Sequence, residues 1–228
     1  MEKITSRKNE YIKSLKANSS GEYICDGLKM LDEADNAGAE ITSILWKETP
    51  GAHSCPVQYV APADLFDYAS PMKNSPGPVF TVKPPVFGEK EISSAIILEN
   101  VQDPGNVGTV IRTAYALGID CVYLCGDCAS LHNTKTIRAS MGAIFKQRVK
   151  VNELPELPIY AAVLAEDAIE IGKVNIKNAA VAIGSEGHGL SKELIAKCAK
   201  KVIIPMQPGA ESLNAAIAAS LFMWEMIR

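Results

Sequence analysis

The sequence predicts an α/β protein in two parts, a parallel sheet with helices on both faces preceded by a small α/β domain. Short apolar segments alternate with helix-like segments along most of the chain, a pattern typical of parallel sheets whose two faces are both covered. Residues 83–92 interrupt this alternation with two prolines, a glycine and several charges, which indicates a linker. The 228 residues are 47% apolar, so the chain can build sizeable cores and is too apolar to be disordered.

The first part, residues 1–82, is expected to contain short strands and helices in alternation. Residues 4–17 have helix-like content with basic faces. A helix is predicted at residues 27–37, where Leu28, Leu31 and Ala34 recur at helical spacing. Another begins at Pro62, because proline suits the first turn of a helix. The strands expected here are residues 22–25, 41–46, 57–60 and 79–82.

The second part, residues 93–228, shows the strand and helix alternation most clearly. A helix is predicted at residues 106–117, and a long apolar helix at 212–227 closes the chain. The expected strands are residues 95–98, 121–125, 159–163, 179–183 and 202–204. Continuous apolar strands of this kind predict a parallel sheet that is buried on both faces.

Charge and hydropathy limit the partners and the compartment. The net charge of −3 excludes a general basic field, so any RNA must bind a local basic patch. The N-terminal run of lysines and arginines up to Lys16 is such a patch, and a solvated helix face explains it equally well. No apolar run reaches the ~18–20 residues of a membrane span, and no signal peptide is visible, so we expect a cytoplasmic protein with reduced cysteines.

Cys121, Cys125 and Cys128 have the C-x3-C-x2-C spacing of an iron–sulfur site. Their context argues against one, because residues 121–125 have the composition of a buried strand. At ~3.3 Å per residue, Cys121 and Cys125 would lie ~13 Å apart along such a strand, too far to bind one cluster. We therefore expect core thiols and no metal.

Three separated motifs in the second part carry the functional signal. In the first, a strand ends at Glu99, and Asp103-Pro104-Gly105 turns into a helix whose first N–H groups face a ligand beyond the strand. It lacks the G-x-G-x-x-G fingerprint, so a dinucleotide-dependent oxidoreductase is a poor fit. The second motif, residues 184–190, has three glycines in six residues and lets the backbone approach a ligand closely. The third spans residues 203–214.

In order and spacing, these motifs resemble the SpoU/TrmH family of RNA ribose 2′-O-methyltransferases, within the SPOUT superfamily. The resemblance covers about residues 93–228. It implies methyl transfer from S-adenosylmethionine to a ribose 2′-hydroxyl. It also implies a C-terminal trefoil knot and a homodimer with the last helix and the cofactor region at its interface.

The resemblance assigns roles to individual residues. Arg112 matches the catalytic arginine and Asn106 the motif asparagine, and Glu186, Ser212 and Asn214 complete the expected catalytic set. The cofactor-binding positions are Gly184, Ile204, Met206 and Leu213. Arginine is almost never deprotonated in proteins, so Arg112 is better suited to stabilising the developing alkoxide than to acting as the base. His188 stands at a variable position and receives no role.

Two departures from the family pattern fall in the third motif. Pro208 stands where relatives often carry the glycine of Met-x-Gly, which leaves the path of this loop open although Gly209 follows. Ala215 replaces the commoner valine. Neither change alters a residue of the expected catalytic set.

The N-terminal part more weakly resembles the small ribosomal-protein-like domain that many family members carry for structured RNA. Arg7 and Lys8 in its opening, and Lys135 and Arg138 in the second part, are the expected RNA contacts. The N-terminal domain favours ribosomal RNA over tRNA as substrate. A tRNA methyltransferase remains an alternative, as does a non-catalytic RNA-binding or ribosome-assembly protein on the same fold.

Overall fold

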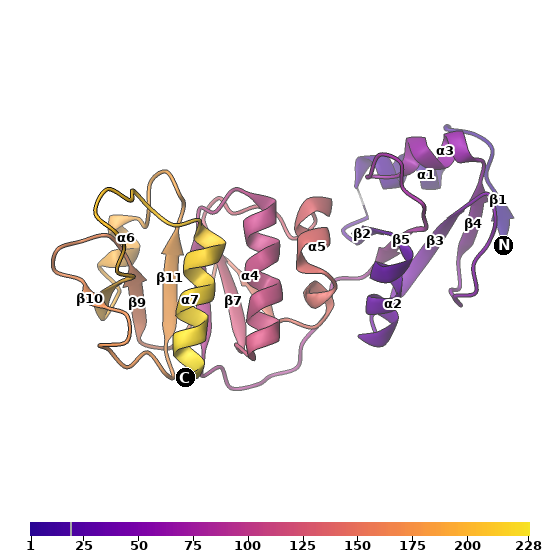
Figure 1. Ribbon diagram of the computed structural model, residues 1–228. Coiled ribbons are helices and arrows are strands. Elements are labelled where there is room, and N and C mark those ends of the chain that lie inside the picture. Colours follow the sequence, from indigo (N-terminus) through magenta and orange to yellow (C-terminus); the bar gives the residue numbers. More distant parts are fainter. Residues whose placement is uncertain (19) are drawn as a thin grey trace. The chain divides into compact units, whose positions relative to one another are not determined.

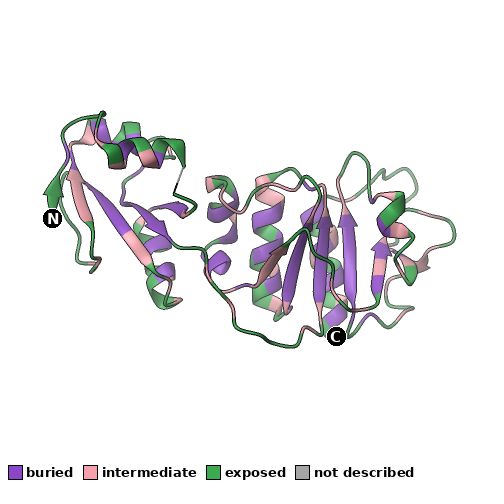
Figure 2. Ribbon diagram, turned by 180° about the vertical axis from the view of Figure 1, so that it is seen from behind, coloured by how far each residue is buried: buried purple, intermediate pink, exposed green. Residues whose placement is uncertain are grey.

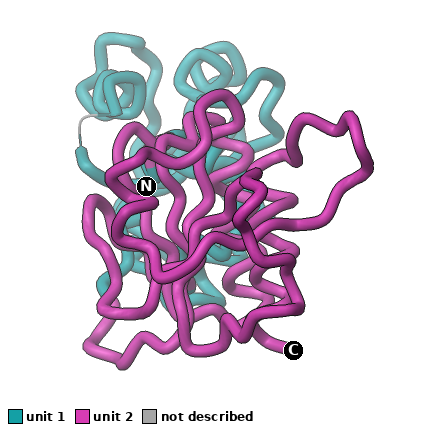
Figure 3. Tube along the Cα trace, turned by 90° about the vertical axis from the view of Figure 1, so that its left-hand side faces the viewer, with its two compact units in different colours: residues 1–86, 131–146 teal, residues 87–130, 147–228 magenta. Residues whose placement is uncertain are grey.

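The computed structural model describes residues 1–18 and 20–228, which form two compact units (Figure 3). Unit 1 comprises residues 1–86 and 131–146, and unit 2 comprises residues 87–130 and 147–228. The boundary at residues 86 and 87 falls inside the predicted linker 83–92, which contains no helix or strand. One segment departs from the predicted division, because residues 131–146 pack in unit 1 although the second domain was predicted to run without a break over 93–228.

Unit 1 is built on a mixed five-stranded sheet in the order β1-β4-β3-β5-β2. Strands β1, β4 and β3 are mutually parallel, and β5 runs antiparallel to both β3 and β2. The strands are β1 (Glu2–Lys3), β2 (Tyr23–Asp26), β3 (Ile41–Lys47), β4 (Gln58–Ala61) and β5 (Val79–Val82). The helices are α1 (Glu10–Ala17), α2 (Leu28–Asn36) and α3 (Ala63–Ala69).

The helix predicted at residues 4–17 begins later, at Glu10. The side-chain oxygen of Asn9 accepts a hydrogen bond from the backbone N–H of Tyr11 and caps the helix, and residues 2–3, ahead of the predicted helix, form β1. In α2, Leu31 and Ala34 are buried as predicted, but Leu28 is 53% exposed, and Met30 is buried instead.

The segment 131–146 forms α5 (Thr134–Ser140) and a short 3-10 helix, η1 (Ala143–Phe145). Ile137, Ile144 and Phe145 are buried in one cluster with Tyr23 and Phe80 of the sheet. This burial removes three large apolar side chains from water, each worth about 1.5–3 kcal/mol, and therefore fixes the segment in unit 1. An ion pair of 2.8 Å between Lys146 Nζ and Glu33 Oε2 adds to it.

Unit 2 is a seven-stranded sheet in the order β10-β12-β9-β11-β6-β7-β8, and every pairing in it is parallel. The strands are β6 (Ala95–Glu99), β7 (Cys121–Cys125), β8 (Val149–Val151), β9 (Ile159–Ala162), β10 (Ile169–Glu170), β11 (Ala180–Gly184) and β12 (Lys200–Ile203). The five predicted strands are confirmed with ends shifted by up to two residues. The short edge strands β8 and β10 were not predicted.

Helices α4 (Pro104–Leu117) and α7 (Ala215–Ile227) lie side by side on one face of this sheet (Figure 1). The other face packs Leu190 and Leu194, the latter from the four-residue α6 (Lys192–Ile195). That face is therefore covered by one short helix and irregular segments rather than by the full helical layer predicted. The central strands β11, β6 and β7 are buried almost throughout (Figure 2).

Cys121 and Cys125 lie at opposite ends of β7, as the strand prediction requires. Burial raises the pKa of each thiol to about 11, so both are protonated at neutral pH. Across residues 1–18 and 20–228, no helix has the length and hydropathy to cross a membrane.

Candidate functional site

The sheet order brings the three motifs to one edge of unit 2. Strands β6 and β11 are neighbours in register, with Gly184 paired to Glu99, so the first and second motifs leave the sheet side by side. The third motif follows β12, which is separated from β11 only by β9. Ligands of open parallel sheets bind at the carboxyl ends of the strands, which is where all three motifs meet.

The first motif sets the start of α4. Asp103 is the N-cap, and its Oδ1 accepts a hydrogen bond of 2.8 Å from the backbone N–H of Asn106. Pro104 occupies the first turn, where its missing N–H costs nothing. The helix thus begins two residues before the predicted Asn106, and Asn106 lies in its first turn beside the end of the sheet.

The second motif forms a tight loop that closes on itself. Ser185 and Gly189 form an isolated antiparallel bridge, and Gly189 has a φ of +67°. A Cβ added at Gly184 would lie 2.1 Å from the carbonyl carbon of Gly189, so this close approach requires glycine at position 184.

A carboxylate holds this loop to the sheet. Glu99, the last residue of β6, accepts hydrogen bonds of 2.7 Å from both the backbone N–H and the hydroxyl of Ser191. We refer to this pair of contacts as the Glu99–Ser191 clamp. This pair of contacts was not predicted, although the position of Glu99 at a strand end within the first motif was a usable signal.

Three predicted catalytic residues form a hydrogen-bonded chain across the motifs. The Nδ2 of Asn106 donates to Oε1 of Glu186, and the Nδ2 of Asn214 donates to Oδ1 of Asn106 at 3.0 Å. The Oδ1 of Asn214 accepts from the backbone N–H groups of Ala216 and Ile217 and so caps α7. The last helix therefore begins at Ala215, not at the predicted Ser212, because Asn214 is its cap.

A cavity of about 490 Å³ opens beside these hydrogen-bonded residues and is lined by all four predicted cofactor residues, Gly184, Ile204, Met206 and Leu213. Glu186 and Ser212 also line it. Its volume falls within the ~300–1,000 Å³ usual for small-molecule sites. The lining residues that were not predicted include Val163, Leu164 and Ala165 after β9, Lys201 and Val202 of β12, and Ala218 and Phe222 of α7. Because β9 lies between the second and third motifs, its end has to contribute to this wall.

A second cavity of about 410 Å³ lies against the first motif and is lined by Asn100, Gln102 and Asp103. Ser185, Glu186 and His188 line both cavities, so the loop of the second motif is a wall shared by the two. Glu186 consequently faces both spaces while Asn106 holds its carboxylate.

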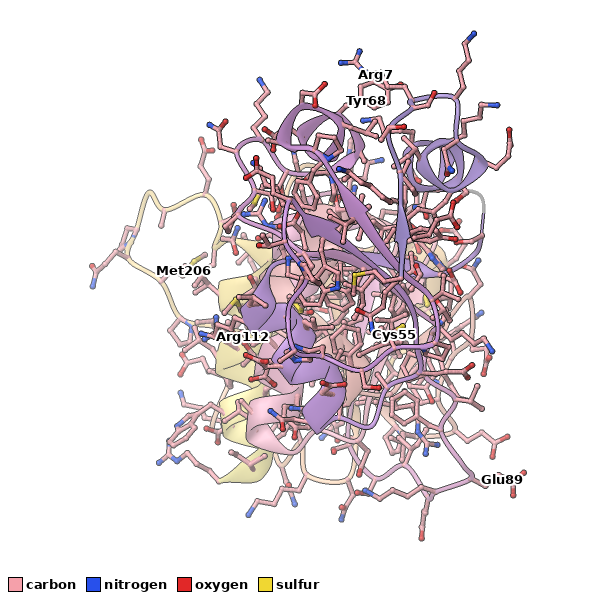
Figure 4. All side chains as sticks on the ribbon, turned by 90° about the vertical axis from the view of Figure 1, so that its right-hand side faces the viewer. Arg7, Cys55, Tyr68, Glu89, Arg112 and Met206 are labelled. Atoms are coloured by element: carbon pink, nitrogen blue, oxygen red, sulfur yellow. The ribbon has the colours of Figure 1, made fainter. Side chains whose placement is uncertain are left out.

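Arg112 does not line either cavity. It is exposed on α4, and among the described residues its guanidinium forms no hydrogen bond or ion pair (Figure 4). The structure thus gathers Asn106, Glu186, Ser212 and Asn214 but does not bring the fifth predicted catalytic residue to them within one chain.

The expected RNA contacts all lie in unit 1. The guanidinium of Arg7 lies 4.5 Å from the ring centroid of Tyr68 (Figure 4), and Lys8 is exposed beside it in sequence. Lys135 and Arg138 are exposed on α5. The prediction had placed these two in the second domain.

The sequence of residues 93–224 matches the model of the SpoU rRNA Methylase family, which is more than half of the chain. Along its whole length, the chain is similar to the 23S rRNA (guanosine(2553)-2′-O)-methyltransferase RlmP of Bacillus subtilis. The two are 27% identical, and the similarity covers 99% of each chain.

Solved structures show the same fold over both units. A crystal structure of an RNA 2′-O ribose methyltransferase has a TM-score of 0.79 and 25% identity, covering 99% of this chain and 98% of that one. The SpoU methyltransferase AviRb from Streptomyces viridochromogenes, in complex with AdoMet, has a TM-score of 0.83 and 21% identity, covering 97% and 98%. Because the family match spans all three motifs and the strands that position them, the chain belongs to the SpoU rRNA Methylase family.

Proposed function

We propose that this protein transfers a methyl group from S-adenosylmethionine to a ribose 2′-hydroxyl of ribosomal RNA. The observation that carries the proposal is the hydrogen-bonded chain of Glu186, Asn106 and Asn214 at the rim of a cavity lined by every predicted cofactor residue. The B. subtilis relative, named as a 23S rRNA 2′-O-methyltransferase, supports ribosomal RNA over tRNA.

The first cavity fits S-adenosylmethionine by shape and chemistry. The loop at Gly184 closes on its own backbone, and Ser185 and Glu186 of the same loop add polar groups to the lining, which suits the polar methionine portion. The neighbouring wall of Val202, Ile204 and Phe222 is apolar and suits the flat face of an adenine. When bound, the cofactor supplies an electrophilic methyl group on a sulfonium.

The residues of the chain then have to position and activate the hydroxyl. We place the target ribose on the side of Glu186 that faces the second cavity, where Asn100, Gln102 and Asp103 offer polar groups. Asn106 and Asn214 keep Glu186 in one orientation. Arg112 carries a permanent positive charge and stabilises the oxygen as its proton leaves.

The exposure of Arg112 is consistent with a homodimer, which we also propose. Ile217, Leu221 and Trp224 form an apolar stripe at helical spacing on α7 and are 53%, 41% and 53% exposed. Tyr115, one turn from Arg112 on the neighbouring α4, is 47% exposed. A second copy packed on this surface would remove the stripe from water.

The remaining features of the proposal rest on the family resemblance and on the sequence pattern alone. They are the trefoil knot in the C-terminal segment, a ribosomal-protein-like fold for unit 1, a cytoplasmic location and a reaction without metal.

The test is transfer of labelled methyl from S-adenosylmethionine to purified rRNA and tRNA pools, followed by localisation of the label on the ribose. We expect label in rRNA, and about 10²–10³-fold less with Arg112→Ala, the usual loss when one charge-stabilising donor is removed. Cofactor binding measured by calorimetry should persist in this variant, because Arg112 does not line the cavity. RNA binding without transfer by the unaltered protein would favour the non-catalytic alternative, and label only in tRNA would overturn the rRNA assignment.

A further inference from the structure

Unit 1 contains a groove of about 470 Å³ that no motif predicted. It lies between the start of α2 and the helix α5, two segments more than a hundred residues apart in sequence, and both belong to unit 1. Its lining consists of Asp26, Gly27, Lys29, Met30, Glu33, Lys135, Arg138, Ala139 and Met141.

Three cations meet in this groove without fixed partners. Lys29 comes from α2, and Lys135 and Arg138 come from α5. Among the described residues, none of these three side chains donates a hydrogen bond or lies within 4 Å of a carboxylate. Like charges gathered on one concave surface raise the local potential and attract an anion.

The two carboxylates of the groove are already engaged. Both oxygens of Asp26 accept hydrogen bonds, at 2.8 Å from the Ser70 hydroxyl and at 2.6 Å from the Ser75 hydroxyl. Glu33 forms its ion pair with Lys146, and this contact chiefly, with a smaller contribution from Lys29, lowers its pKa. The groove therefore offers unused donors on its basic side and few unused acceptors.

The rest of the lining suits a nucleoside next to a phosphate. Met30 is buried and Met141 is 39% exposed, which gives the groove an apolar surface of two adaptable side chains. Gly27, the N-cap of α2, adds no side chain, and the first turn of that helix contains no acidic residue to repel an anion. These features supplement the three cations.

We infer that this groove binds the sugar–phosphate backbone of the RNA substrate, with its phosphates on Lys29, Lys135 and Arg138. The inference rests on the proposed function for the identity of the partner. It also deepens that function, because it adds Lys29 to the expected RNA contacts. Lys135 and Arg138, which the sequence predicted only as separate surface charges, line the same groove. The contact lies in unit 1, so we expect it to hold and position RNA rather than to take part in the chemistry.

The experiment measures RNA affinity by fluorescence anisotropy from 50 to 200 mM salt, using the full-length chain and an rRNA fragment that it methylates, or total rRNA fragments if no methylation is found. The variants are Lys29→Gln, Lys135→Gln, Arg138→Gln and the triple combination. The control is Lys83→Gln, which removes a lysine of unit 1 that already forms an ion pair with Glu40 and lies outside the N-terminal basic run. Each groove variant should bind about tenfold more weakly, and the slope of log affinity against log salt should fall by about one per residue. The control should leave both quantities unchanged.

Two further measurements separate this inference from the proposed function. Methyl transfer by the groove variants should show a raised KM for RNA with kcat at saturating RNA and cofactor affinity unchanged. Groove variants with wild-type RNA affinity and salt slope would overturn the inference even if methyl transfer is confirmed. Conversely, if the variants lower the salt slope but the protein transfers no methyl group, the RNA-binding groove would be supported and the proposed reaction would be overturned. Calorimetry with AMP should show no tight binding; a micromolar AMP site lost in the triple variant would make this a free-nucleotide site and overturn the RNA assignment.

Discussion

At the scale of single residues, Asn214 divides two tasks between the two ends of one amide. Its oxygen caps α7, and its nitrogen holds Asn106, which in turn holds Glu186. The two tasks are separable by substitution because aspartate retains the oxygen and lacks the N–H donor.

We expect Asn214→Asp to keep the stability of the wild type and to lose methyl transfer, because the cap survives while Asn106 loses its donor. Asn214→Ala should lose transfer and also about 1 kcal/mol of stability, the usual cost of removing a cap. Thermal unfolding and a methyl-transfer assay measure the two effects. Wild-type turnover in Asn214→Asp would show that the Asn106–Asn214 contact has no functional role.

The polar residues that the structure gathers, which are Asn106, Glu186, Ser212 and Asn214, could be predicted from the sequence because the residue types and spacing of the three motifs are distinctive. The hydrogen bonds among its members could not be, since Asn106 and Asn214 are more than a hundred residues apart and either amide could have pointed to solvent. The Glu99–Ser191 clamp was missed for a related reason, because glutamate at a strand end has no single partner that the sequence prescribes.

At the scale of elements, the Glu99–Ser191 clamp predicts a selective effect on the cofactor. Glu99→Ala removes both acceptors that hold the loop of the second motif, which is a wall of the cavity. Hydrogen bonds to a charged group contribute about 1.5–3 kcal/mol, so cofactor affinity should fall at least about tenfold while kcat at saturating cofactor changes little. The control is Glu193→Ala on α6, which removes an exposed carboxylate nearby. Unaltered affinity in Glu99→Ala would exclude the clamp as a support for the cavity.

A second carboxylate fastens the segment that leads into β6. Burial alone would raise the pKa of Asp120, but hydrogen bonds from Lys90, Ser93 and Ser94 together hold it well below its ordinary value. A carboxyl with a lowered folded-state pKa stabilises the fold above its unfolded pKa of about 3.9, and this contribution is lost as the pH falls through the folded value.

Asp120→Asn should therefore lower the free energy of unfolding at pH 7, and the difference from wild type should shrink below about pH 4. Denaturant unfolding between pH 3 and pH 8 measures this. Asp167→Asn is the matched control, because Asp167 is exposed and pairs only with Lys201, so its effect should be small. A difference that stays constant across this pH range would contradict the assigned role of the Asp120 carboxylate.

Most elements were predictable to within a few residues, and the errors have local causes. Two helices start later than predicted because Asn9 and Asn214 cap their first turns. The predicted helices had been extended toward the N-terminus past these capping residues. The edge strands β8 and β10 were not predicted, because segments of three and two residues show too little periodicity to detect. The short α6 left one face of the sheet without the full helical layer, which alternation alone cannot reveal.

At the scale of the whole molecule, the apolar stripe on α7 predicts the oligomeric state. Trp224→Glu should convert a dimer to a monomer, because it places a charge on the apolar surface that a second copy would bury. Val151→Glu, at a residue of similar exposure on the edge strand β8, should leave the dimer intact. Light scattering after size-exclusion chromatography decides between them. A monomeric wild-type protein would contradict the proposal.

The assignment of residues 131–146 to unit 1 has a practical consequence for exchanging parts between relatives. A fragment ended at the linker would lack Ile137, Ile144 and Phe145 from its core, and would also lack two of the three groove cations. A chimera that takes only the first 86 residues from another family member would thus combine half of one parent's RNA groove with half of the other's. The groove can be transplanted as a unit only if residues 131–146 are moved together with the N-terminal segment.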